Sequence, residues 1–129
     1  MHESLQRQFG NIDIYLFDQL LKGTYDQCKT IIDVGCGYGR NIVYLLQRGF
    51  DVYGVDPNSE AIESVRELAS RLSGRSNSEN FRVESAEELS SADSYFNLAI
   101  CSAVLHFAKD DNQFNKMLAQ IWRVIKPGG

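Results

Sequence analysis

The chain has 129 residues, 43% of them hydrophobic and 23% charged, and its formal net charge is −4 at pH 7. This length and composition predict one globular domain with a single core, and they exclude wholesale disorder. The acidic balance argues against a nucleic-acid partner, and no apolar stretch approaches the ~18 residues of a membrane span.

Residues 3–22 carry apolar side chains three or four positions apart, a spacing that predicts helix. Gly10 and Asn11 divide this stretch into a short helix and a longer one, and Asn11 is able to cap the second. From residue 30 onward, short apolar runs alternate with amphipathic ones, which predicts right-handed βαβ units and a parallel sheet. The expected strands are 30–34, 51–55, 81–84 and 96–101, and the expected helices are 38–48, 59–72 and 111–125.

The last of these helices has the clearest signals at its ends. Asp110 and Gln113 have the spacing of a capping box, and Pro127 with the glycines after it stops the helix. We expect Trp122 to be a packing residue. One apolar side of the helix is expected to carry Phe114, Met117, Leu118, Ile121 and Ile125.

The turn after the first expected strand is the most informative part of the chain. Gly35, Gly37 and Gly39 are spaced two apart, and glycine lets a ligand approach the backbone closely. The next strand ends at Asp56, whose carboxylate is able to accept both hydroxyls of a ribose. The pattern therefore predicts a nucleoside-bearing cofactor, held where the strands end.

A nicotinamide dinucleotide is another cofactor that fits a glycine turn followed by an acid. A nicotinamide dinucleotide enzyme uses GxGxxG, whereas this chain has GxGxG with Asp33 just before the turn. A dinucleotide turn does not need an anion so close to the pyrophosphate, so an NAD(P)-binding domain is the weaker alternative.

The sequence also resembles a family, the class I S-adenosylmethionine-dependent methyltransferases, over residues 30–129. The resemblance implies an α/β, Rossmann-like three-layer sandwich with a parallel sheet in the order 3-2-1-4. It further implies a methyltransferase domain spanning 1–129, in which residues 1–29 form a helical lid over the cofactor-binding core 30–129. The matching segments are 33–39, 55–58, 85–89, 96–102 and 123–129.

The resemblance also implies the cofactor, S-adenosyl-L-methionine, and the residues that bind it. Asp33 would accept from the cofactor ammonium or bond to loop N–H groups, and Asp56 would hold the ribose. Arg40 would meet the cofactor carboxylate or remain a surface arginine. The glycine turn, with Gly35, Cys36, Gly37 and Gly39, would lie against the amino-acid tail and ribose, with Gly39 allowing close packing of helix on strand.

Later segments would complete the pocket. Pro57 and Asn58 would line the adenine, while Ala86 and Glu87 would meet its amine; alternatively, Glu87 is a solvated acid at a helix start. Cys101, Ser102 and Leu105 would lie near the ammonium and the sulfonium. His106 would deprotonate the acceptor, or it is a loop histidine bonded to backbone.

Methyl transfer by in-line displacement takes most of its rate from alignment, so a catalytic base is optional. The Gly39-Arg40-Asn41 continuation resembles the branch that contains tellurite-resistance and thiopurine-type enzymes. The expected acceptor is therefore a small molecule. A module that binds S-adenosylmethionine without turnover is the alternative.

Three cysteines without CxxC spacing, Cys28, Cys36 and Cys101, predict neither a metal site nor a disulfide framework, and they favour a cytoplasmic protein. The family continues with further strands where this sequence stops, so we expect a piece of a longer methyltransferase. Its fourth strand would then be an apolar edge, which predicts a homodimer through that edge.

Overall fold

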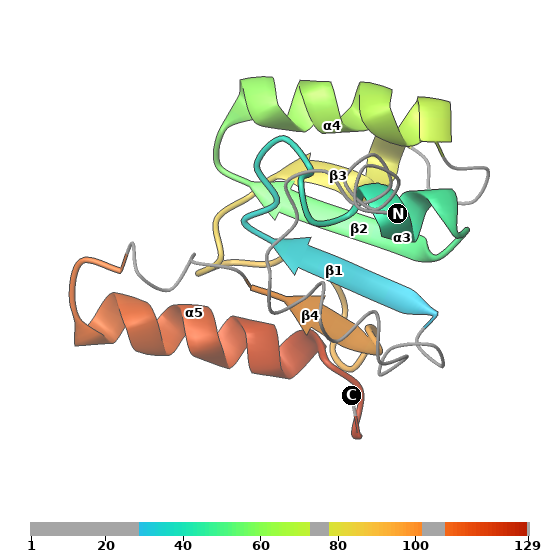
Figure 1. Ribbon diagram of the computed structural model, residues 1–129. Coiled ribbons are helices and arrows are strands. Elements are labelled where there is room, and N and C mark those ends of the chain that lie inside the picture. Colours follow the sequence, from blue (N-terminus) through green and yellow to red (C-terminus); the bar gives the residue numbers. More distant parts are fainter. Residues whose placement is uncertain (1–28, 73–77, 102–107, 129) are drawn as a thin grey trace, which may run out of the picture.

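The computed structural model describes residues 29–72, 78–101 and 108–128, so the expected helices within 1–28 lie outside it. Its centre is a sheet of four parallel strands in the order β3-β2-β1-β4 (Figure 1). The predicted sheet order is therefore confirmed. The strands are β1 (Thr30–Val34), β2 (Asp51–Asp56), β3 (Phe81–Val83) and β4 (Leu98–Ile100).

Helices cover both faces of the sheet, which confirms the Rossmann-like three-layer arrangement. Helices α3 (Val43–Gln47) and α4 (Ser59–Leu72) lie on one face, and α5 (Asp111–Val124) lies on the other (Figure 1). A short 3-10 helix, η1 (Ser78–Asn80), precedes β3.

The core has two parts because β1 is buried on both faces. Ile31 packs with α3 and α4, and its neighbour Ile32 packs with α5. Alternate side chains of a strand point to opposite faces of the sheet, so one apolar strand supplies both clusters.

Helix α3 begins later than its amphipathic pattern predicts. The expected start was residue 38, but Gly39 has φ +91°, which a right-handed helix does not allow. The chain makes turns here instead, in which Ile42 N–H donates to Gly39 O at 3.2 Å. The glycine turn is thus longer than expected, and the helix starts at Val43.

Strand β4 is shorter than the apolar run 96–101. Asn97 N–H donates to Thr30 O of β1, so the backbone groups of Phe96 point to the other side. There Phe96 forms a parallel bridge with Ile125, and Lys126 N–H donates to Phe96 O at 2.8 Å. The chain that leaves α5 therefore covers the beginning of the outer edge of β4.

The cap of α5 is confirmed, because Asp110 Oδ1 accepts from Gln113 N–H at 2.8 Å. The reciprocal bond runs from Lys109 N–H to Gln113 Oε1 rather than from the N–H of the cap residue itself. The predicted apolar side is partly wrong. Met117, Ile121 and Val124 face the sheet, whereas Phe114, Leu118 and Trp122 are exposed.

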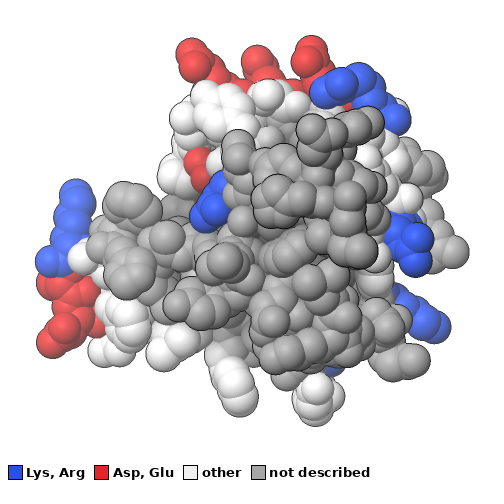
Figure 2. Space-filling view, in the orientation of Figure 1, with Lys and Arg blue, Asp and Glu red and all other residues white. Residues whose placement is uncertain are grey.

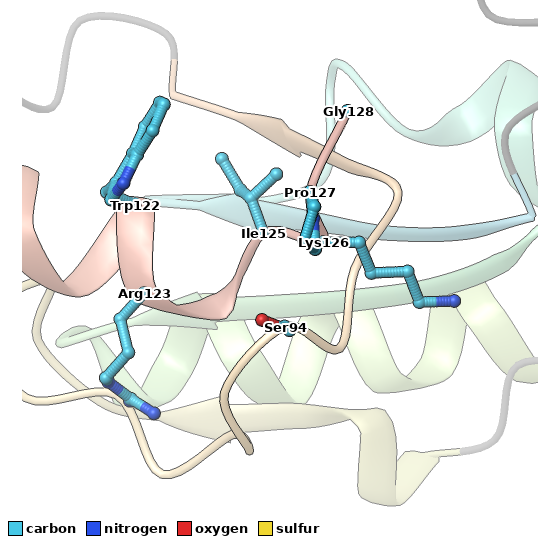
Figure 3. Close-up of a pocket in the computed structure, with 7 residues that line it drawn as sticks. All are labelled: Ser94, Trp122, Arg123, Ile125, Lys126, Pro127 and Gly128. Atoms are coloured by element: carbon cyan, nitrogen blue, oxygen red, sulfur yellow. The ribbon is translucent and has the colours of Figure 1, made fainter.

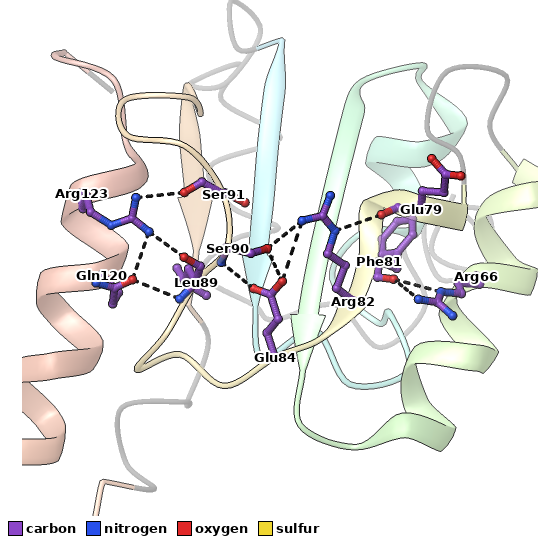
Figure 4. A network of polar contacts seen from close by, with 10 residues as sticks. All are labelled: Arg66, Glu79, Phe81, Arg82, Glu84, Leu89, Ser90, Ser91, Gln120 and Arg123. Atoms are coloured by element: carbon purple, nitrogen blue, oxygen red, sulfur yellow. Dashed lines mark hydrogen bonds and ion pairs between the residues drawn. The ribbon is translucent and has the colours of Figure 1, made fainter.

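One flank of α5 is fixed by polar contacts with the chain that follows β3 (Figure 4). The guanidinium of Arg123 donates to Leu89 O at 2.8 Å and to Ser91 O at 2.9 Å, and it also pairs with Asp93. Gln120 Oε1 accepts from Leu89 N–H at 3.1 Å. These contacts set the rotation of α5 about its own axis.

Gly54 of β2 is a tight packing position. A Cβ there would lie 2.9 Å from Cδ1 of Phe81 and 3.0 Å from Sγ of Cys36. We expect Gly54→Ala to lower the free energy of unfolding by about 1–3 kcal/mol through overpacking, measured by urea denaturation.

Gly49 is the matched control, because a Cβ there meets nothing within 4 Å although φ is +83°. Gly49→Ala tests conformational cost alone, about 1–2 kcal/mol. Phe81→Leu should recover part of the loss in Gly54→Ala and none in Gly49→Ala. Equal coupling in both double mutants would contradict the packing explanation.

Candidate functional site

The candidate site lies where β1 and β2 end side by side, with Val34 opposite Val55 in the register. Gly35 N–H and Cys36 N–H both donate to Val55 O, at 2.8 and 3.0 Å. The turn after β1 is therefore fixed against the end of β2. In open α/β sheets, ligands bind at this carboxyl end.

Asp56 joins the two strand ends directly. Its Oδ2 accepts from Gly37 N–H at 3.0 Å, and its Oδ1 accepts from Asn58 N–H at 2.9 Å. The structure thus brings together the acid and the glycine turn that the sequence singled out. A carboxylate has about four lone-pair sites, so Asp56 keeps the capacity to accept from a ligand hydroxyl.

Asp33 is 1% exposed, and within the described residues its Oδ1 accepts no hydrogen bond. Burial raises the pKa of its carboxyl to about 7, Arg40 opposes that shift, and Asp56 adds to it. A buried carboxylate without a partner is costly unless a cationic or hydrogen-bonding group reaches it. The alternative role, bonding to loop N–H groups, has no such bond at Oδ1.

Gly37 and Gly39 have different surroundings. A Cβ at Gly37 would meet nothing within 4 Å, and its φ is +53°, so the turn leaves open space beside the Asp56 bond. A Cβ at Gly39 would lie 3.0 Å from side-chain atoms of Val65 and Leu68. Gly39 therefore lets the turn pack against helix α4, whereas close packing of a helix on a strand was expected.

The other predicted residues of this half of the site lie nearby in different roles. Asn58 caps α4, since its Oδ1 accepts from Glu60 N–H at 3.0 Å and Ala61 N–H at 3.3 Å. Pro57 and Arg40 are exposed. Cys36 is buried in the core, and burial raises the pKa of its thiol far above the ordinary range, so only its backbone faces the turn.

Glu87 has a partner that sequence reasoning missed. Its Oε1 accepts from Gln113 Nε2 of α5 at 2.7 Å, and residues 85–88 form a turn. The alternative of a solvated acid at a helix start is therefore wrong. Ala86, 6% exposed, packs with the α5 side of the core. The only signal for this contact was the capping position of Gln113, which predicts a different bond.

Cys101 directly follows β4 and packs against the α5 side of the core. Ser102, Leu105 and His106 lie outside the described residues, so their roles stay predictions. Within 29–72, 78–101 and 108–128, no group of three or more metal-ligating side chains comes together. In the same ranges, no helix combines the length and the apolar character needed to cross a bilayer.

A family model for a methyltransferase domain matches residues 31–129. The chain belongs to the class I S-adenosylmethionine-dependent methyltransferase family. Its fold matches a solved S-adenosylmethionine-dependent methyltransferase of Methanosarcina mazei with a TM-score of 0.70 and 33% identity, over 84% of this chain and 52% of that one. Membership of this family assigns S-adenosyl-L-methionine as the cofactor.

Two curated relatives agree with this family. A putative methyltransferase of Bacillus subtilis, YqeM, is 28% identical over 100 residues, which are 77% of this chain and 39% of that protein. A ubiquinone biosynthesis O-methyltransferase of Rickettsia akari is 33% identical over 100 residues, 77% of this chain and 37% of that protein. The chain thus spans about two fifths of the length of these relatives.

Asp33 gives a pH-dependent prediction. Its pKa is raised from 3.8 to about 7. Between these two pH values the folded state therefore keeps a proton that the unfolded state has released. The free energy of unfolding therefore falls as the pH rises from 3.8 to about 7. The contribution of the Asp33 proton to stability is complete below pH 3.8 and is lost at about pH 7. The difference in free energy of unfolding between Asp33→Asn and wild type should therefore grow in favour of the variant from pH 3.8 to about 7 and stay constant at higher pH. The measurement is urea denaturation without ligand.

Glu63→Gln, at an exposed position of α4, is the control for changing a carboxylate into an amide. A stability difference between Asp33→Asn and wild type that stays flat from pH 3.8 to 7 would show that Asp33 is not a strained buried acid.

Proposed function

We propose that this protein transfers the methyl group of S-adenosylmethionine to a small-molecule acceptor. The observation that carries the proposal is a buried carboxylate, Asp33, whose Oδ1 accepts no hydrogen bond from the described residues, at the same end of the sheet as Asp56, which already meets the glycine turn. When bound, the cofactor supplies a sulfonium methyl group that a nucleophile displaces in line. The residues of this chain bind and orient the two molecules.

The donor and acceptor groups at the carboxyl ends of β1 and β2 suit this cofactor. Asp33 Oδ1 is a buried acceptor that no described residue bonds, which fits a hydrogen bond from the ammonium of the amino-acid tail. Asp56 has lone pairs left for ribose hydroxyls beside the open space at Gly37. Two carboxylates near the turn would repel a pyrophosphate, so the charges also favour this cofactor over a dinucleotide.

Surface charge and relatedness support a small acceptor. The outer face of α4 carries exposed Glu60, Glu63 and Glu67, and Figure 2 shows acidic side chains gathered along it. A phosphate backbone would be repelled there. The Rickettsia relative is named an O-methyltransferase of ubiquinone biosynthesis, which supports an oxygen nucleophile on a small molecule. His106 remains the proposed base for such a hydroxyl, with the backbone-bonded loop histidine as its alternative.

A module that binds cofactor without turnover is the second candidate. It is favoured by the extent of the match, since 129 residues span about two fifths of the curated relatives. Calorimetric binding of cofactor followed by a methyl-release assay on a small-molecule panel distinguishes the two. Binding without release on any acceptor would favour the module.

Asp56→Ala should weaken the binding of S-adenosylhomocysteine by about 1–3 kcal/mol, roughly 5–150-fold in Kd, because hydrogen bonds to a polar ligand are lost. The measurement is isothermal titration calorimetry at constant pH. Asp51→Ala, at the other end of β2, is the control and should leave Kd unchanged.

An unchanged Kd in Asp56→Ala would remove Asp56 from the site. Tight binding of NAD(H) together with no binding of S-adenosylhomocysteine would overturn the proposed cofactor site altogether.

A further inference from the structure

Gln113, in the first turn of α5, makes three hydrogen bonds, two of them through its side-chain amide. Its Nε2 donates to Glu87 Oε1 at 2.7 Å, and its Oε1 accepts from Lys109 N–H at 2.6 Å. Its backbone N–H donates to the cap residue, Asp110, at 2.8 Å. The reverse orientation of the amide would set its oxygen against a carboxylate and its NH2 against an N–H, so only one orientation fits.

The bond between Gln113 and Glu87 joins α5 to the turn that follows β3, across 26 positions of the chain. Glu88 N–H closes this turn by donating to Ser85 O at 3.2 Å. Helix α5 begins at the end of the sheet toward which β1 and β2 point (Figure 1). That end carries the candidate site, so Gln113 fixes a turn at its border. Capping of the helix by Asp110 does not require this second contact.

The turn 85–88 adjoins Asp56 on the side away from the glycine turn. Glu84 N–H donates to Asp56 O at 3.2 Å, and β3 pairs with β2 in parallel. The carboxyl ends of β3, β2 and β1 therefore stand in a row, about 5 Å from one strand to the next. A ligand with its ammonium at Asp33 and its ribose at Asp56 extends next over the turn 85–88. The ribose carries the amino-acid tail and the base on opposite sides, so the base is the part that reaches this turn.

The carboxylate of Glu87 is suited to an amine on that base. Its Oε1 already accepts from Gln113, and a carboxylate has about four lone-pair sites, so it keeps the capacity to accept from a ligand. The amide of Gln113 is uncharged, so it holds the carboxylate in place without neutralising it. A hydrogen bond from an amine to a charged acceptor is stronger than one to a neutral acceptor. Fixing the side chain in advance also removes part of the entropic cost of binding.

We propose that Gln113 is a positioning residue, which holds the Glu87 carboxylate for the exocyclic amine of the adenine and so makes the site selective for that base. The inference rests on the proposed function, because it takes S-adenosylmethionine as the ligand. A base with a carbonyl oxygen in place of the amine would set that oxygen against the carboxylate of Glu87. Such a ligand is rejected because it loses the bond and leaves the acceptor facing another acceptor.

Calorimetric titration of the full chain with S-adenosylhomocysteine and with S-inosylhomocysteine tests this proposal, since the second ligand has a carbonyl oxygen where the first has the amine. The wild type should prefer the adenosyl ligand by about tenfold or more in Kd, the scale of one hydrogen bond to a charged group. Gln113→Met keeps the length of the side chain and should lose most of this preference. The ratio of the two Kd values is the readout, because a general loosening of α5 would weaken both ligands alike.

Gln120→Met is the matched control, because Gln120 also links α5 to the chain after β3, but through the backbone N–H of Leu89. It should leave the ratio of Kd values as in wild type. The double exchange of Glu87→Gln with Gln113→Glu re-forms the bond with donor and acceptor reversed, and it leaves the amide oxygen at position 87 to accept the amine. It should recover most of the preference that Gln113→Glu alone loses. Circular dichroism confirms that each variant is folded.

An unchanged ratio of Kd values in Gln113→Met would overturn the proposal, as would an equal fall in Gln120→Met. A wild type that binds the adenosyl ligand without preferring it would also overturn the proposal and leave the proposed function standing. A wild type that binds neither ligand would instead contradict the proposed function, and this inference with it. Additive losses in the double exchange would show that the two side chains act separately, against the proposal.

Discussion

The hydrogen bond from Gly37 N–H to Asp56 Oδ2, 3.0 Å long, joins the two halves of the candidate site. It links residues 19 positions apart and fixes the open part of the glycine turn against the end of β2. The two bonds to Val55 O hold the beginning of the same turn. The space above Gly37 and the buried carboxylate of Asp33 both depend on the turn keeping this position.

The two ends of the sheet have separate chemistry. At the carboxyl end the chain presents carboxylates and open backbone, which suit a small cationic and hydroxyl-rich ligand. At the amino end it presents Trp122 and Ile125 beside a pocket of about 350 Å³ (Figure 3). The two ends therefore have no side chains in common, although β1 and α5 belong to one core.

Prediction from sequence succeeded where a local pattern had one physical outcome. The β-branched run before Asp33 allowed only a buried strand, and β1 has the expected bounds. Asp110 could cap a helix by its own side chain, and it does so. Prediction failed for the start of α3, because Gly39 has a left-handed φ in a turn that lies close to Val65 and Leu68, and periodicity does not reveal either feature.

The sequence by itself determined the order of elements, the parallel sheet and the meeting of a glycine turn with Asp56, because periodicity and topology suffice for these. Only the tertiary structure decided which way α5 is turned. Its apolar residues cover more than one face, and the bonds of Gln120 and Arg123 to the chain after β3 bury one row and leave Trp122 exposed. Such contacts join residues about 30 positions apart, and no local pattern encodes them.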